Sequence, residues 1–184
     1  MKPFKNALIV GRFQPIHIGH MKIIDIALRV ADKVLIFASS SDKVGTVRNP
    51  FSVEYRIKLI EKVYSKEIEE GRLQVLPLAD LTNENDLTFA WGDYVISHAN
   101  NVLNEKLECI IYGKDKNIFK CFSKKIVKGI SEIYVDRNQL EISATKLRQY
   151  IIDDDRHSFE KYTSEKIHSE YDKLRSILLK INEE

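Results

Sequence analysis

Two histidines three residues apart follow the first apolar run and have the chemistry to hold phosphate. They belong to the segment Gly11-Arg12-Phe13-Gln14-Pro15-Ile16-His17-Ile18-Gly19-His20. On the opening turn of a helix, His17 and His20 face the same way. A helix start also offers unpaired N–H groups and a partial positive charge. Arg12 adds a forked donor suited to phosphate, so we predict a polyphosphate site here.

The glycines of this segment have predicted roles of their own. Gly11 ends the apolar run where a side chain would obstruct a ligand, and Gly19 lets phosphates approach the backbone between the imidazoles. A lone histidine is more often a surface or core residue, but two histidines around a glycine after Gly-Arg favour function. Zinc is the competing chemistry, yet no third Cys, His or carboxylate ligand is spaced beside them. We predict no protein metal ligands.

A second cluster of polar residues lies far along the chain, in Ile142-Ser143-Ala144-Thr145-Lys146-Leu147-Arg148. Ser143 is a good N-cap, which places Thr145 and Arg148 in the first turns of a new helix. That helix start predicts a second anion site, with Arg148 directed back toward the ligand. Taken alone, the pattern is also common at ordinary helix starts.

The elements that must position these residues alternate between short apolar runs and helix-period segments. This alternation is typical of parallel βαβ units and predicts an α/β, Rossmann-like, doubly wound parallel sheet with helices on both faces. Ligands of such sheets bind at the carboxyl ends of strands. We expect one domain over residues 1–184, with a core of about 5–152 and a C-terminal helical extension of about 153–184. The predicted strands are Ala7–Val10, Lys33–Ala38, Leu73–Leu76, Cys109–Tyr112 and Glu132–Val135.

Composition narrows the class of protein further. The 184 residues are 43% hydrophobic and 30% charged, with a net charge of +2, which gives no global case for nucleic acid binding. No apolar stretch approaches the ~20 residues that cross a membrane, and Met1 to Asn6 are unlike a signal peptide. Cys109 and Cys121 lack metal or disulfide spacing. We expect a soluble, cytoplasmic protein that binds no membrane.

The two phosphate segments together resemble the nucleotidylyltransferase superfamily. More narrowly, the chain is similar to the nicotinamide mononucleotide (NMN) adenylyltransferases of the archaeal type and their bacterial relatives. Ser39-Ser40-Ser41 and Asn49-Pro50-Phe51-Ser52 also match that group, and the resemblance covers about residues 5 to 152. It implies transfer of AMP from ATP to NMN, giving NAD and pyrophosphate, with Mg²⁺ as cofactor. It also implies a homo-oligomer. The loop Val44-Gly45-Thr46-Val47 departs from the archaeal pattern.

The resemblance also implies roles for individual residues. His17 and His20 would contact the ATP phosphates, and Arg12 and Arg148 would hold phosphate oxygens. Trp91 would stack on the nicotinamide ring, although packing in a core is the open alternative. The further residues implied for ATP are Gly11, Phe13, Gln14, Gly19, Gly113, Asp115, Ile142, Ser143 and Thr145. Those implied for the acceptor are Ser40, Arg48, Asn49 and Trp91.

Several alternatives stay open at this point. A transferase of the same fold could use CTP, or accept nicotinic acid mononucleotide, flavin mononucleotide or pantetheine phosphate. A nucleotide-sensing regulator would bind the same ligands without turnover, although it would not need both His17 and His20. A fragment of a class I aminoacyl-tRNA synthetase shares only the His-Ile-Gly-His appearance and would need a lysine-rich second signature that the chain lacks.

Overall fold

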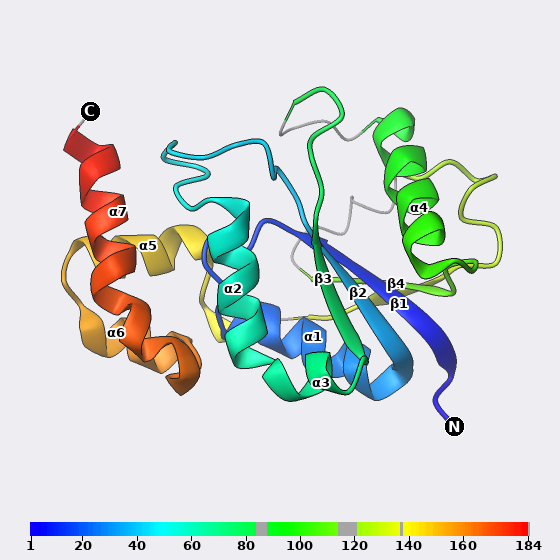
Figure 1. Cartoon of the computed structure of the whole chain (residues 1–184), viewed down its shortest axis with the longest axis horizontal. Coiled ribbons are helices and arrows are strands. Elements are labelled where there is room, and N and C mark those ends of the chain that lie inside the picture. The colour runs from blue at the N-terminus through cyan, green and yellow to red at the C-terminus, as the bar shows by residue number, and fades with distance from the viewer. Residues whose placement is uncertain (84–87, 114–120, 137, 184) are drawn as a thin grey trace.

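Five parallel strands form the centre of the protein (Figure 1). The computed structural model describes residues 1–83, 88–113, 121–136 and 138–183. The strand order in the sheet is β3-β2-β1-β4-β5. The first three strands are added toward one edge and the last two toward the other, so the order reverses between β1 and β4. All five predicted strands are confirmed. Their bounds are β1 Phe4–Gly11, β2 Ala31–Ala38, β3 Leu73–Pro77, β4 Cys109–Tyr112 and β5 Ser131–Tyr134.

Helices follow the strands in the order that the apolar periodicity predicts. The first two are α1 Ile18–Val30 and α2 Val53–Val63, whose buried faces include Ile24, Leu59 and Ile60. The described connection from β4 to β5 includes turns at residues 124–129. None of the described helices combines the length and apolar character needed to span a bilayer. The others are α3 Ser65–Glu69, α4 Phe89–Leu103, α5 Ala144–Ile152, α6 Arg156–Tyr162 and α7 Tyr171–Glu183, with 3₁₀ turns η2 Asn138–Leu140 and η3 Glu165–Glu170.

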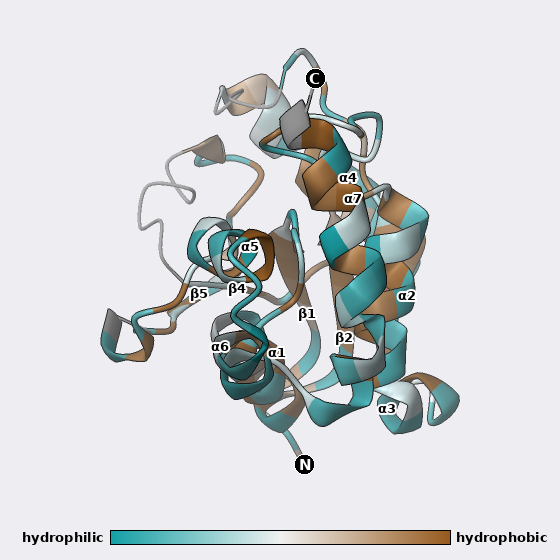
Figure 2. Ribbon diagram, turned by 90° about the vertical axis from the view of Figure 1, so that its left-hand side faces the viewer, coloured by the Kyte–Doolittle hydropathy of each residue, from teal (hydrophilic) through white to brown (hydrophobic). Residues whose placement is uncertain are grey.

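The strands are apolar on both faces because each face is covered by helices. Successive residues of β1 point to opposite sides, so Leu8 packs in the core beneath α4 and Ile9 in the core beneath α1 and α2. In Figure 2 the helices carry both teal and brown residues, as amphipathic helices that cover a sheet do. The doubly wound arrangement with helices on both faces is therefore confirmed.

The C-terminal helices pack on the chain's own core beside α2 (Figure 1). Leu174 and Leu178 of α7 are both buried there. Glu170 reinforces the contact, because the Tyr55 hydroxyl donates to its carboxylate at 2.9 Å and Lys62 forms an ion pair with it. The apolar residues of α7 thus pack within the chain itself.

Glu170→Ala should lower the free energy of unfolding by about 1.5–3 kcal/mol, because the buried Tyr55 hydroxyl loses a charged acceptor and Lys62 its ion-pair partner. The Lys62 ion pair lowers the pKa of Glu170 below its ordinary 4.5. A lowered carboxyl pKa stabilises the fold at neutral pH, and this contribution is lost progressively as the pH falls below 4.5. Urea unfolding of both proteins from pH 7 to pH 3 measures the difference. The exposed Glu165→Ala is the control, and equal losses in both variants would contradict the assignment.

Gly92 of α4 is the point where that helix meets the chain that follows β4. A Cβ at this position would lie 2.6 Å from the Phe122 ring and would also clash with the Cys121 carbonyl. Gly92→Ala should therefore destabilise the protein by roughly 1–3 kcal/mol through overpacking. Thermal unfolding next to the exposed Ala90→Ser tests this. A melting temperature equal to that of the control would show that α4 can shift at no cost.

Candidate active site

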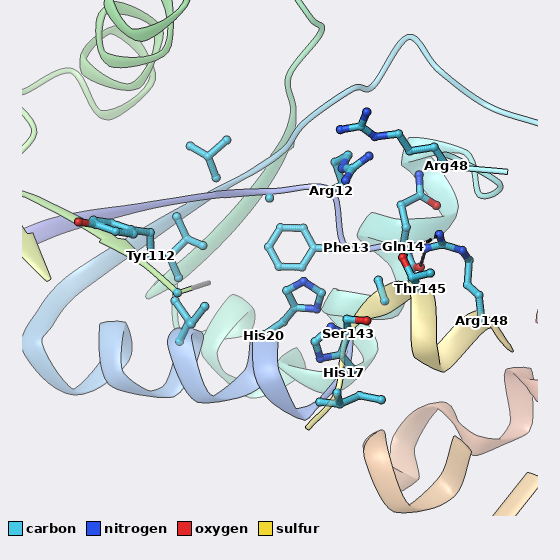
Figure 3. Close-up of a pocket in the computed structure, with 17 residues that line it drawn as sticks. Arg12, Phe13, Gln14, His17, His20, Arg48, Tyr112, Ser143, Thr145 and Arg148 are labelled. Atoms are coloured by element: carbon cyan, nitrogen blue, oxygen red, sulfur yellow. Dashed lines mark hydrogen bonds between the residues drawn. The ribbon is translucent and has the colours of Figure 1, made fainter. Parts of the chain in front are cut away.

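A cavity of about 520 Å³ opens at the carboxyl ends of β1 and β4, where the sheet order reverses (Figure 3). This is the position at which open α/β sheets bind ligands. The starts of α1 and α5 close its sides, so segments more than a hundred residues apart in sequence share one wall. The predicted residues that line it are Gly11, Arg12, Phe13, Gln14, His17, His20, Arg48, Gly113, Ile142, Ser143, Thr145 and Arg148.

The two histidines are fixed by the start of α1. His17 is the N-cap of this helix, and its Nδ1 accepts the Gly19 N–H at 3.0 Å. An acceptor Nδ1 leaves the proton of the neutral ring on Nε2, which is then a hydrogen-bond donor. The His20 ring lies 3.9 Å from the His17 ring and 4.8 Å from the Phe13 ring, centroid to centroid. The predicted pairing of the two imidazoles is therefore present.

The glycines act differently from the sequence-based expectation. The Gly19 N–H is engaged by His17, and Gly19 is not among the residues that line the cavity. A Cβ on Gly11 would lie 3.1 Å from the Phe13 ring. Phe13 has a left-handed backbone, with φ of 52°, which places its ring against the end of β1. The absence of a side chain at Gly11 thus leaves space for the Phe13 ring, which packs against the His20 ring.

Arg148 joins the two phosphate segments. Its Nη1 donates to the Gln14 carbonyl at 2.9 Å and its Nη2 to the Thr145 hydroxyl at 3.4 Å. Burial and the neighbouring charge of Arg12 both lower the pKa of Arg148, although an arginine stays protonated at neutral pH. The predicted orientation of Arg148 toward the site is therefore observed. Ser143 caps α5 by accepting the Lys146 N–H, also as predicted.

The cavity has a cationic end and an apolar end. Arg12, Arg48 and Arg148 lie together at one end in Figure 3, and Tyr112 lies at the other. No aspartate or glutamate of the described chain is among the lining residues. The cavity wall also contains Ile9, Val10, Ile23 and Tyr112, which the sequence did not single out for the site. A site of this shape suits a nucleoside polyphosphate, with the base on the apolar side and the phosphates on the arginine side.

Two of the predicted acceptor residues lie beside the cavity rather than in its wall. Ser40 is 2% exposed, and its hydroxyl donates to the Asp80 carboxylate at 3.0 Å. Asn49 is fully buried, and its Oδ1 lies 3.5 Å from the Gln14 amide nitrogen. Both side chains therefore support loops at the rim of the site. Their contact with an acceptor stays a prediction.

Trp91 also lies outside the cavity wall, and Asp115 falls outside the described residues. Trp91 sits in the first turn of α4 with 7% of its surface exposed. Its ring stacks on Phe122, with 6.2 Å between the centroids. This position agrees with core packing, the alternative named above. Stacking on the nicotinamide ring stays a prediction.

The donor set of the cavity is suited to anions and not to a protein-held cation. Within the described ranges, no three His, Cys, Asp or Glu side chains are grouped closely enough to hold a metal ion.

Taken together, the doubly wound sheet and the polar cavity at its switch point define an α/β nucleotide-binding protein. The family profile described as Cytidylyltransferase-like matches residues 8–150, and the chain belongs to this family. The predicted membership in the nucleotidylyltransferases is thereby confirmed.

Two proteins that are similar in sequence share the name of one kind of nucleotidylyltransferase. The nicotinamide-nucleotide adenylyltransferase of Thermoplasma volcanium is 30% identical over 147 residues, which cover 80% of this chain and 75% of that protein. The enzyme of the same name from Thermococcus kodakarensis is 37% identical over 94 residues, or 50% of this chain and 48% of that protein. The matched region thus spans about half of the Thermococcus relative.

A solved structure agrees with these relatives. The bifunctional NMN adenylyltransferase/ADP ribose pyrophosphatase of Francisella tularensis, complexed with AMP and Mn ion, matches with a TM-score of 0.65 and 27% identity. The match covers 81% of this chain and 42% of that chain.

Proposed function

We propose that this protein is an adenylyltransferase that transfers AMP from ATP to NMN, giving NAD and pyrophosphate. The observation that carries the proposal is the joining of two distant phosphate segments, residues 11–20 and 142–148, in one cavity with an apolar end. The relatives named nicotinamide-nucleotide adenylyltransferase support the choice of acceptor.

In the proposed reaction, the 5′-phosphate of NMN attacks the α-phosphorus of ATP in line, and pyrophosphate leaves. The attacking phosphate is already largely ionised near neutral pH, so the protein needs to supply no nucleophile. Its task is to align the two phosphates and to stabilise the charge on the equatorial and leaving oxygens. His17 and His20 would donate to the ATP phosphates from the start of α1. Arg12 and Arg148 would hold phosphate oxygens at the cationic end of the cavity.

Mg²⁺ would enter as the counter-ion of ATP. The cavity wall supplies arginine and histidine donors and no carboxylate from the described residues, so the phosphate oxygens themselves would hold the ion. The manganese in the Francisella tularensis structure supports the use of a divalent cation in this class of site. The ion neutralises phosphate charge, and the protein's own residues position the phosphates.

The remaining proposals concern the whole protein. We place the C-terminal helices in the same domain as the sheet, because Leu174 and Leu178 complete its core. Cys109 and Cys121 are both buried and are not joined in a disulfide, which suits a reducing compartment such as the cytoplasm. We propose that the protein works there as a homo-oligomer.

An acceptor panel tests the proposed function. Purified protein is incubated with ATP, Mg²⁺ and, in parallel, NMN, nicotinic acid mononucleotide, flavin mononucleotide or pantetheine phosphate, with product separation by chromatography. The expected result is NAD from NMN and ATP, and no product in a parallel incubation in which CTP replaces ATP. Dinucleotide formed from flavin mononucleotide and none from NMN would contradict the proposed acceptor.

A further inference from the structure

Arg56 is a fully buried arginine in the first turn of α2 that does not line the cavity. Its guanidinium donates four hydrogen bonds, and all four go to backbone carbonyl oxygens rather than to a carboxylate. Nη1 donates to Arg12 at 2.6 Å and to Ser39 at 2.9 Å. Nη2 donates to Ser40 at 3.1 Å, and Nε donates to Phe51 at 3.2 Å.

These four carbonyls belong to three separate loops at the rim of the site. The first loop follows β1 and carries Arg12, which lines the cavity. The second follows β2, and the third runs from Arg48, another lining residue, to the start of α2. One side chain therefore spans the backbone segments that bear two of the three cavity arginines.

Gln14 strengthens the link between the first and third loops. Its Oε1 accepts the Phe51 N–H at 3.1 Å, and its Nε2 donates to the Phe51 carbonyl at 3.2 Å. The Phe51 carbonyl thus receives donors from both Gln14 and Arg56. The protein's own side chains tie these loops at several points, which is what pre-organisation of a phosphate site requires.

The position demands an arginine for a chemical reason. A guanidinium is planar and directs its donors along several fixed lines, whereas a lysine ammonium presents donors from a single point. Burial lowers the pKa of Arg56 to about 10, which still leaves it charged at neutral pH. A neutral or shorter side chain would leave buried carbonyls without donors.

We propose that Arg56 is a positioning residue that fixes the loops after β1, after β2 and before α2, so that Arg12 and Arg48 project into one cavity. This inference rests on the proposed function, since its readout is turnover of ATP and NMN. It predicts that Arg56 affects phosphate handling through Arg12 and Arg48 without touching the substrate.

The test compares Arg56→Lys with a matched control, Arg72→Lys. Arg72 also donates to a backbone carbonyl, that of Leu28 at 2.6 Å, but it lies just before β3, at the amino ends of the strands, and does not line the cavity. We expect Arg56→Lys to raise the KM for ATP and lower kcat/KM at least tenfold, and Arg72→Lys to stay within about twofold of the unaltered protein. Equal kcat/KM in the two variants would overturn the proposal.

A double-mutant cycle separates positioning from general stability. If Arg56 acts through Arg12, Arg56→Lys should lower kcat/KM much less in an Arg12→Ala background than in the unaltered protein. Full additivity of the two losses would overturn the proposal. An unaltered protein that makes no NAD would instead refute the proposed function, so the two failures are distinguishable.

Hydrogen exchange on the unaltered protein gives an answer even if the Arg56 variants do not fold. The amides of residues 12–14, 39–41, 49 and 51 should be protected in the absence of nucleotide, because the loops are already held. Exchange at unprotected rates that slows only on addition of ATP would contradict the proposal.

Discussion

His20→Ala should lower kcat by about 10²–10³-fold, the usual cost of removing one donor to a developing charge. The His20 ring lines the cavity and packs on the rings of His17 and Phe13. Because it is only partly buried, its removal should leave the fold intact. Steady-state kinetics with ATP and NMN, together with thermal unfolding, measure the two effects.

The control for this variant is His157→Ala, which removes an exposed histidine of α6. It should have the turnover of the unaltered protein. A kcat for His20→Ala within threefold of that control would exclude the proposed phosphate role of the histidine pair.

Arg148→Ala should lower kcat/KM for ATP by about a hundredfold or more, because it removes from the cavity a guanidinium group that can bind phosphate through two donors. It also leaves the Gln14 carbonyl without its donor from α5. Arg148→Lys keeps the charge but cannot donate to Gln14 and to a phosphate with the same geometry. We expect it to recover only part of the loss.

Arg29→Ala is the matched control, because it removes an exposed arginine at the end of α1. Its kcat/KM should equal that of the unaltered protein. If Arg148→Lys were fully active, net positive charge at this position would be sufficient, and the contact with Gln14 would have no role in catalysis.

The sheet could be predicted because each strand is a short apolar run between helix-period segments. The helix starts could be predicted for the same local reason: the Nδ1 of His17 and the hydroxyl of Ser143 cap α1 and α5 within three residues of themselves. The cationic end of the cavity follows from these local patterns. The polar residues of this end come from separate segments, and folding brings them together at the carboxyl ends of β1 and β4.

The parts that escaped prediction depend on contacts between distant segments. Arg56 lies in a helix-patterned stretch, and its reach to the Arg12 and Ser39 carbonyls has no signature in the sequence. Tyr112 and Ile9 look like core residues and gain a second role only because the strands end at a cavity. Trp91 could stack on a ligand or pack in a core, and residue type alone does not distinguish these roles.

The most direct measurement of the central claim follows the α-phosphate of ATP. The protein is incubated with [α-³²P]ATP, Mg²⁺ and NMN, and the products are separated and counted. The account predicts that the label moves into NAD, with one unlabelled pyrophosphate released for each NAD formed. Label found only in ADP or free AMP, or label that stays in ATP while NMN is present, would contradict adenylyl transfer in this cavity.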